Sequence, residues 1–499
     1  MFRRRASVRL SGCFGRYSSA IKAARANERS CGSARGGASD GRSYHDQLTP
    51  RTETVPRYER NVVSQQSCVG WASLVKLNWI ERRPQLMNRS ATFGVIGGSG
   101  STGKTVAKEL RSSTDGAILI GGRNLASLEA VAAVLGAPVS ATRVDVRDPQ
   151  SLEEFCGRCS VVVNCGGPVS ELHDMVAQAA LRTRSHYVDV AGLTLVREGM
   201  MRHDQELSDL GLACVVSAGW LPGMTELLPA YSLAVAKTRM NAIHSLAIHF
   251  GDSGEWSNTA MRDIVWYLRK FGRRRPRYIH NGEWVRAKLS EVLVEKDVGS
   301  PMGRCLFSMS CLPEMAELMG RFKGCDGRAF TYLPSRRTAV VGSLIALLPL
   351  PVDFAIRRLR PALRAESLPV GGFSVVEIQG RSEAHEVSHR YRVTFERGRE
   401  YWMNAVIAAT VARLISEGGR VKTGVHFLMD AVNPLTFMEE LRRVGISPQM
   451  ESFTCWRTLA EGRTCSAITD ENGQGHTWIP KTDRQISCHM ASNRQLPNK

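Results

Sequence analysis

A glycine-rich segment, Gly97-Gly98-Ser99-Gly100-Ser101-Thr102-Gly103, follows a short apolar run and precedes a helical pattern. Glycines at this spacing allow a tight turn and let the backbone approach a pyrophosphate, which the N-terminus of the next helix stabilises. Continued by Lys104 and Thr105, the same letters also satisfy the phosphate loop of ATP-binding proteins, where lysine contacts phosphate and threonine contacts magnesium. The segment predicts a nucleotide-phosphate site of one of these two kinds.

Residues farther along the chain favour a dinucleotide. A second apolar run ends in Arg123 and Asn124, about twenty residues after the glycine segment, where Rossmann proteins contact the ribose. Arginine at this place suits the 2′-phosphate of NADP(H), whereas an acidic residue would suit NAD. Asp145 ends the third run on the expected adenine side, and Asn164-Cys165-Gly166-Gly167-Pro168 ends the fourth, where a glycine turn approaches the nicotinamide half. Asp145 could also be the acid of an ATP site, so an ATP-binding enzyme stays open as an alternative.

Hydride transfer to or from a substrate also requires a proton donor. Tyr187 and Asp189, near the end of the fifth apolar run, are our candidates for catalysis. The alternative for Tyr187 is a core position, and for Asp189 a helix cap. His249 and Glu255 are further options that the sequence does not rank.

Two other motifs have the letters of metal sites, but their sequence context argues against metal binding. His385-Glu386-Val387-Ser388-His389 has the letters of a zinc-protease helix, but its flanks alternate like strands, which would place the histidines about 13 Å apart. Cys156 and Cys159 form a CxxC without a partner pair. We therefore expect no metal site.

The elements that position these residues divide into two kinds. From residue 91 to 217, apolar runs alternate with helical patterns, which predicts a doubly wound α/β Rossmann domain with a parallel sheet. Residues 218–447 show longer alternating strands with grouped helices, which predicts an α+β domain with a mixed or antiparallel sheet.

Charge is concentrated at one end of the chain. The 499 residues include 66 Lys and Arg against 47 Asp and Glu, and residues 1–90 hold 17 of the bases and 6 of the acids. Residues 1–86 therefore predict a flexible basic leader, either a transit-like segment or a tail before a start at Met87, and residues 448–499 a second loosely ordered tail. We expect a cytoplasmic protein, with a mitochondrial location as the alternative implied by the leader.

The remaining composition limits the partners. An apolar share of 43% and a charged share of 23% exclude a fully disordered chain, a collagen-like fibre and a polytopic membrane protein. Sparse aromatic residues among the bases argue against a nucleic-acid partner. The uncharged run at residues 339–352 is too short to span a bilayer, so we expect a buried helix there, with interfacial membrane contact as the alternative. We also consider a homodimer.

In the order of its motifs the chain resembles the saccharopine dehydrogenase-like oxidoreductases. The matching pieces are FGVIGGSGSTGK, ILIGGRNLASLEAV, VDVRDPQSL, VVVNCGGP, HYVDVAG and CVVSAGWLPGMTELL, and weaker likeness continues to about residue 447. The resemblance implies an NADP-binding domain facing a substrate domain. Two departures, Leu193 in place of an acidic residue and Gly219-Trp220-Leu221-Pro222-Gly223 without an aspartate, argue for a more apolar substrate than an amino acid.

The residues and the resemblance together predict an NADP(H)-dependent oxidoreductase. Its hydride would pass to or from a C=N, C=O or C=C carbon of a small-molecule or lipid-like substrate. The alternatives are an ATP-binding enzyme and a non-catalytic NADP-binding sensor.

Overall fold

The structure is a computed structural model that describes residues 91–273, 275–310, 314, 317–318, 320, 324–364, 368–383, 385–457, 464–469 and 475–478. These residues all lie in one compact unit of the chain. The predicted basic leader, residues 1–86, and most of the chain after residue 457 lie outside the described residues.

The first sheet is parallel throughout and has the strand order β15-β6-β5-β4-β1-β2-β3. The order 3-2-1-4-5-6 of its first six strands in the chain is that of a doubly wound Rossmann fold, which confirms the predicted class. Central strands are buried on both faces, as their continuous apolar runs require. The strands are β1 (Thr92–Ile96), β2 (Ala117–Gly122), β3 (Val139–Arg143), β4 (Val161–Asn164), β5 (His186–Asp189), β6 (Ala213–Val216) and β15 (Gly424–Phe427).

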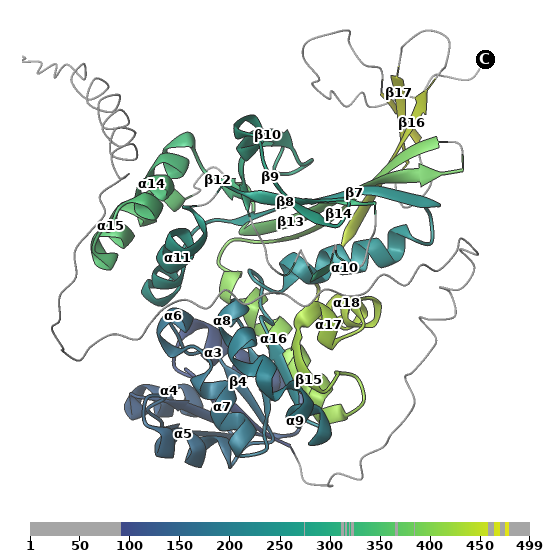
Figure 1. Cartoon of the computed structure of the whole chain (residues 1–499). Coiled ribbons are helices and arrows are strands. Elements are labelled where there is room, and N and C mark those ends of the chain that lie inside the picture. Colours follow the sequence, from purple (N-terminus) through teal and green to yellow (C-terminus); the bar gives the residue numbers. More distant parts are fainter. Residues whose placement is uncertain are drawn as a thin grey trace, which may run out of the picture. The chain divides into compact units, whose positions relative to one another are not determined.

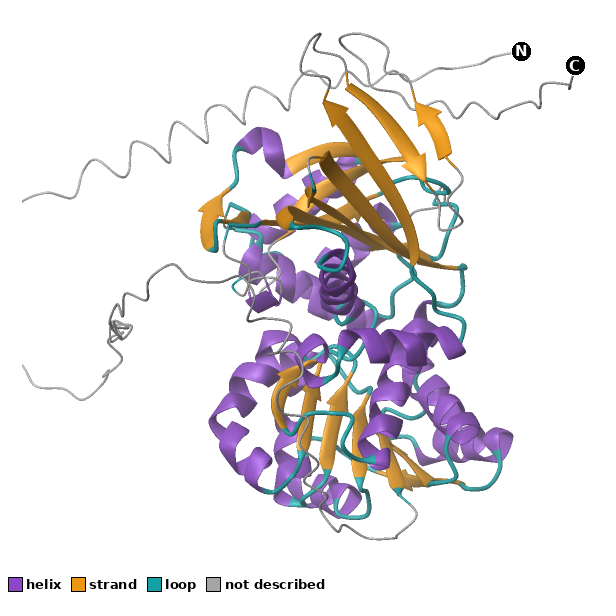
Figure 2. Ribbon diagram, turned by 90° about the vertical axis from the view of Figure 1, so that its right-hand side faces the viewer, coloured by secondary structure: helices purple, strands orange, loops and turns teal. Residues whose placement is uncertain are grey.

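Helices cover both faces of this sheet (Figure 2). Local signals fix several of their ends: α4 begins after Asn124, whose side chain accepts a hydrogen bond from the Ser127 backbone, and α5 begins after Asp148 with Pro149 at its first position. The segments between the strands are α3 (Ser101–Ser113), α4 (Leu125–Leu135), α5 (Pro149–Cys156), α6 (Val169–Leu172), α7 (Met175–Arg182), α8 (Leu193–Met200), the 3₁₀ turn Met201–His203 and α9 (Asp204–Asp209).

The chain returns to this first sheet near its end. Strand β15 pairs with β6, and α16 (Glu400–Glu417), with eleven buried residues, packs against α3 and β4. The expected boundary at residue 217 therefore does not separate the two sheets, because the Rossmann layer is completed by residues about 200 positions later. Two short helices, α17 (Leu428–Ala431) and α18 (Pro434–Arg443), follow β15.

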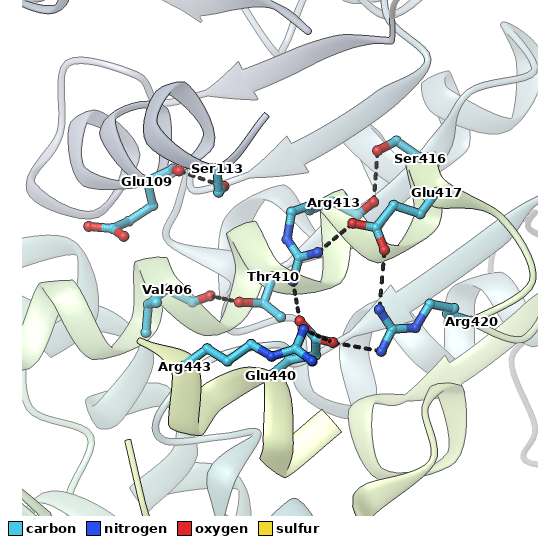
Figure 3. Close-up of polar contacts among 10 residues, drawn as sticks. All are labelled: Glu109, Ser113, Val406, Thr410, Arg413, Ser416, Glu417, Arg420, Glu440 and Arg443. Carbon is cyan, nitrogen blue, oxygen red and sulfur yellow. Dashed lines mark hydrogen bonds and ion pairs between the residues drawn. The ribbon is translucent and has the colours of Figure 1, made fainter. Parts of the chain in front are cut away.

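A buried carboxylate fastens the returning segment. Glu440 of α18 is 4% exposed and accepts hydrogen bonds from Arg413 at 2.7 Å and from Arg420 and Arg443 at 2.8 Å (Figure 3). Burial alone would raise the pKa of Glu440, but the hydrogen bonds from Arg420 and Arg413 outweigh it and hold the pKa below its usual range. The cluster ties α18 to α16 and to the loop that follows α16.

The second sheet is mixed, as predicted. Its main path runs β10-β11-β12-β7-β13-β14-β16-β17-β18, with β12 and β7 parallel and the other pairs antiparallel. Helix α10 (Met224–Ala236) lies along β7, β13 and β14 (Figure 1). The strands are β7 (Ala242–Asp252), β8 (Arg277–His280), β9 (Glu283–Arg286), β10 (Leu293–Asp297), β11 (Arg304–Ser310), β12 (Asp326–Leu333), β13 (Gly372–Ser382), β14 (His385–Phe395), β16 (Gln449–Arg457), β17 (Thr464–Thr469) and β18 (Gly475–Trp478).

The last three strands lie in the region expected to be a loosely ordered tail. Strand β16 instead continues the second sheet by pairing antiparallel with β14, and β17 and β18 follow it. The expectation differs from the structure because β17 and β18 are short and β16 lacks a regular apolar alternation, so the period of two is weak in the sequence.

Three helices that lie between strands of the second sheet in the sequence form a layer of their own. They are α11 (Asn258–Phe271), α14 (Arg336–Leu347) and α15 (Val352–Leu363). They pack on one another around Met261, Val265, Ile345 and Leu359. A one-turn helix, α12 (Leu289–Val292), lies between β9 and β10. The prediction of a buried helix over residues 339–352 is wrong for one face of α14, where Val340 and Leu347 are each 58% exposed.

Candidate functional site

The glycine-rich segment forms the turn between β1 and α3. The backbone N–H groups of Gly97 and Gly98 both donate to the carbonyl of Gly121 on the neighbouring strand, at 2.8 and 3.1 Å. Gly97 has φ +76°, and a Cβ at Gly103 would clash with the carbonyl oxygen of Gly97. Helix α3 begins after Gly100 without a side-chain cap, so its first N–H groups remain available to an anion. These features fit the pyrophosphate of a dinucleotide.

The lysine and threonine of the ATP-type motif do not lie where contact with phosphate and magnesium would require them. Thr105 Oγ1 donates to the Ser101 carbonyl at 2.8 Å, within the first turn of the helix. Lys104 is exposed, and neither residue lines the cavity described below. Together with the strand order, these positions favour dinucleotide binding over an ATP site.

The residues predicted for the adenosine half lie at the ends of β2 and β3. Arg123 and Asn124 follow β2 and are exposed along the cavity wall, but the Asn124 side chain is already engaged as the cap of α4. Asp145 follows β3, lines the cavity, and accepts a hydrogen bond from the Arg147 backbone at 3.1 Å. Arg123 therefore has the more available side chain of the pair after β2, and its contact with the 2′-phosphate remains a prediction.

The loop after β4 is held by an asparagine and by the second part of the molecule. Asn164 is buried, and its Oδ1 accepts the backbone N–H of Gly166 at 2.9 Å. Asp263 of α11 accepts the N–H groups of Val169 and Ser170, at 3.0 and 2.9 Å. Gly166 and Gly167 therefore lie in a turn fixed from both sides, next to the cavity.

The two predicted proton donors take different positions. Tyr187 is 2% exposed, does not line the cavity, and its hydroxyl accepts a hydrogen bond from Asn164 Nδ2 at 3.2 Å. Tyr187 thus supports the Asn164 loop. Asp189 does line the cavity, and its Oδ1 accepts the N–H groups of Ala191, Gly192 and Ser217.

The pKa of Asp189 is shifted toward neutral pH. Burial raises its pKa to about 6, against the lowering effect of the hydrogen bonds from Ser217 and Gly192. Its Oδ2 is buried and has no hydrogen-bond partner among the described residues. A protonated carboxyl at this oxygen would have a donor to offer.

The two further candidates for proton transfer, His249 and Glu255, also differ in whether they line the cavity. His249 is buried on β7, where its ring stacks on Phe330 with centroids 5.0 Å apart, and burial lowers its pKa to about 4. It does not line the cavity, whereas Glu255 does.

Sequence reasoning missed several acidic groups at the cavity. Asp252, at the end of β7, accepts hydrogen bonds from Trp256 Nε1 at 2.7 Å and from the Gly254 backbone at 2.9 Å, and desolvation raises its pKa to about 6. Glu314 also lines the cavity, and burial raises its pKa and that of nearby Glu226. A carboxylate at a strand end was a readable signal for Asp252, but Glu314 and Asp263 reach the site only through the tertiary fold.

These residues surround one cavity of about 1570 Å³. It begins at the carboxyl ends of β1 to β5 and continues to the ends of β7, β11 and β12 of the second sheet. Typical small-molecule pockets are about 300–1,000 Å³, so this one has room for a dinucleotide together with a second molecule. Aromatic and proline side chains form much of the wall beyond the nucleotide region: Trp220, Pro222, Trp256, Trp266, Tyr267, Trp284 and Tyr332.

The two metal-like motifs take structural roles. His385 and His389 lie on β14, a strand and not a helix. Burial raises the pKa values of Cys156 and Cys159 to about 12, so neither is a ready thiolate ligand. Within the described residues, no group of three or more His, Cys, Asp or Glu side chains is arranged to hold a metal ion.

The fold and the loop geometry define a dinucleotide-binding Rossmann protein. Residues 93–215 match the family described as the saccharopine dehydrogenase NADP binding domain. A human saccharopine dehydrogenase-like oxidoreductase is 28% identical over 196 residues, which cover 36% of this chain and 45% of that protein. A trans-acting enoyl reductase of Mycobacterium leprae is 30% identical over 131 residues, 25% of this chain and 31% of that protein.

A solved structure extends the likeness beyond the first domain. The saccharopine dehydrogenase (L-Glu forming) of Saccharomyces cerevisiae superposes with a TM-score of 0.51 at 13% identity, covering 72% of this chain and 99% of that one. At this identity the match shows the fold alone. The sequence matches span less than half the length of the curated relatives.

Residues 93–215 therefore match a saccharopine dehydrogenase NADP-binding domain, and the predicted resemblance to the saccharopine dehydrogenase-like oxidoreductases is confirmed. NADP(H) is confirmed as the cofactor of this domain type.

Proposed function

We propose that this protein is an NADP(H)-dependent oxidoreductase whose substrate is a small molecule of apolar, lipid-like character with a C=N, C=O or C=C bond. The observation that carries the proposal is the continuous cavity from the glycine turn of the first sheet to the strand ends of the second. When bound, NADPH supplies the hydride. The chain's own residues bind and orient the cofactor and the substrate, and they supply the proton.

The binding role belongs to the ends of the first-sheet strands. The turn at Gly97–Gly103 and the free N-terminus of α3 receive the pyrophosphate, and Arg123 pairs with the 2′-phosphate. The loop at Asn164–Pro168, fixed by Asp263, directs the nicotinamide half toward the second sheet.

The apolar character of the substrate follows from what lines the rest of the cavity. Leu193 and Leu221 occupy the places where the motifs of the family carry acidic residues, and both line the cavity together with Trp220. The backbone N–H of Trp220 is already bonded to Asn404 at 2.8 Å. At these three positions an amino-acid substrate would find no charged side chain, whereas an apolar one gains burial.

The proton belongs to Asp189. Its carboxyl lines the cavity, its pKa is raised to about 6, and its Oδ2 is free of hydrogen-bond partners among the described residues. Such a group is partly protonated near neutral pH and suits general acid or base catalysis.

A fluorescence titration tests the nucleotide part. NADPH and NADH are titrated into the wild-type chain, Arg123→Asp and a control, Arg158→Asp, whose arginine is exposed but outside the cavity lining. We expect Arg123→Asp to weaken NADPH binding by about tenfold or more while NADH binding changes little, and Arg158→Asp to match the wild type. Binding of ATP–Mg²⁺ in place of NADPH would overturn the proposal.

A substrate panel tests the reaction. NADPH oxidation is followed with imines, ketones and enoyl thioesters of short and long alkyl chains. Turnover that rises with chain length supports the proposal. Tight NADPH binding without oxidation across the panel would favour the non-catalytic sensor instead.

A further inference from the structure

Helix α14 has three faces with different surroundings. Ile345 is buried in the helix layer, and Thr338, Ala339, Gly342 and Ser343 line the cavity. The third face is apolar and exposed: Val340 is 58%, Leu344 38% and Leu347 58% exposed, and Leu348, at the cap of the helix, is 43% exposed. These positions follow the spacing i, i+4, i+7, i+8 and so share one side. We call these four residues the α14 apolar face.

Exposure of this kind is unusual for a water-facing helix. Single exposed apolar residues are common, but four large ones in two turns form a contiguous strip that costs free energy in water. The strip continues into exposed prolines at positions 349 and 351. A contiguous apolar strip of this size marks a contact surface.

The surface around the α14 apolar face is strongly basic. Helices α11, α14 and α15 together carry eight basic residues and two acidic ones. Both acids are engaged, Asp353 by Arg262 at 2.9 Å and Asp263 by the backbone of Val169 and Ser170. The layer therefore presents a net positive field.

Some of these cations are fixed beside the apolar face itself. Arg273 donates to the Ala346 carbonyl at 2.9 Å, and Arg269 donates to the Leu350 carbonyl. Both guanidinium groups are thereby held at the end of α14 that exposes Leu347 and Leu348. Arg337 is exposed at the other end of the helix.

We propose that the α14 apolar face, with the basic residues of α11, α14 and α15, is a docking surface for an anionic lipid membrane. Apolar side chains that enter the headgroup boundary, bordered by arginines that meet anionic lipids, are the chemistry of interfacial binding. In the described part of the chain, no helix is both long and apolar enough to cross a bilayer, so the contact is peripheral. A second copy of the chain fits less well, because a twofold contact would bring two basic layers together.

Helix α14 also forms part of the cavity wall, with a different face from the apolar one. A membrane bound to the α14 apolar face would lie one helix away from the cavity. The docking surface itself is inferred from exposure and charge and does not depend on the proposed reaction.

Vesicle flotation of the full-length chain tests the docking surface. The wild type is mixed with vesicles of phosphatidylcholine alone or of phosphatidylcholine with phosphatidylserine, near physiological salt. The test variant is Leu344→Glu with Leu347→Glu. The control is Val134→Glu with Leu289→Glu, which changes two apolar residues that are 86% and 73% exposed elsewhere in the fold. Both double variants keep the basic residues 1–90 and make the same change in net charge, so nonspecific attraction to anionic lipid is matched.

We expect the wild type and the control to float with the anionic vesicles, and the α14 variant to lose about tenfold or more in partitioning. A second variant, Arg269→Gln with Arg273→Gln, should weaken binding to anionic vesicles and leave NADPH affinity unchanged. Equal flotation of wild type and α14 variant would overturn the proposal. So would a wild-type dimer in sedimentation that the α14 variant converts to monomer, which would assign the face to a second copy.

Discussion

Asp189 combines two tasks that are usually given to different residues. One carboxylate oxygen accepts three backbone N–H groups and so shapes the loop after β5, while the other is buried without a partner among the described residues. Replacing Asp189 by Asn separates these tasks, because the amide oxygen can still accept from the backbone while the titrating proton is lost. We expect Asp189→Asn to bind NADPH as the wild type does and to lose about 100-fold or more in turnover.

The stability of the protein should also depend on the protonation of Asp189. Because the folded pKa of Asp189 is raised to about 6 from 3.8, the native state binds the proton more tightly than the unfolded state. The contribution of Asp189 to stability is therefore greatest at low pH and declines as the pH rises from about 4 to about 6. Because Asp252 and Glu314 also have raised pKa values, denaturant unfolding at several pH values should show a decline in both proteins, steeper in the wild type than in Asp189→Asn. Unchanged turnover in the variant would remove Asp189 from the mechanism.

At the same scale, the sequence predicted the positions of the glycine turn and of Arg123 beside the cavity, while their contacts with NADP(H) stay predictions. The glycine turn and Arg123 could be predicted because their signals are local: spacing within one turn, and position at a strand end. Asp263 could not, because it is 94 residues from the Val169 backbone that it binds. Tyr187 was predicted to donate a proton, but the fold directs its hydroxyl to Asn164 and away from the cavity lining.

Among the elements, the returning segment depends on the carboxylate of Glu440. Three arginines bond to it while it is 4% exposed, but Arg443 is itself exposed, and Arg413 and Arg420 also pair with Glu417. Glu440→Gln removes the charge that these hydrogen bonds share, so we expect a loss of about 1–3 kcal/mol in unfolding free energy. Glu439→Gln is the matched control, because Glu439, next to Glu440 on α18, has a side chain that is 57% exposed and pairs with Arg442. The control should change the unfolding free energy little.

The same carboxylate predicts a pH dependence. Because the pKa of Glu440 is lowered in the fold, its contribution to stability is present above the ordinary glutamate pKa and is lost as the pH falls through the folded value. Chemical unfolding of the wild type and Glu440→Gln should therefore converge in acid. Curves that stay a constant distance apart down to low pH would contradict the assignment.

The elements themselves were predictable to different degrees. Strands β1, β2, β4, β5 and β6 gave clear apolar runs because most of their residues are buried. The place of β15 beside β6 follows from pairing across a separation of more than 200 residues. The local pattern of a strand does not reveal a partner so far away in the chain.

At the scale of the whole molecule, the chain is interleaved and not divided at residue 217. It leaves the first sheet after β6, builds most of the second sheet, returns through α16 and β15, and then extends the second sheet with β16. Residues 189, 252, 263, 314 and 404 come from segments far apart in the chain, and all of them line the cavity. The interleaving makes the nucleotide site dependent on segments far from it in the sequence.

This architecture predicts that residues 87–217 alone do not make a working NADP-binding domain. Without α16, the faces of α3 and β4 that it covers would be exposed, and without β15 the edge of β6 would be open. We expect residues 87–217 to aggregate or to bind NADPH at least about tenfold more weakly, and residues 87–457, which keep α16, β15 and β16, to bind as the full chain does. Circular dichroism and NADPH fluorescence on the three chains measure this. If residues 87–217 bind NADPH with full affinity, the returning segment serves the second sheet and not the cofactor site.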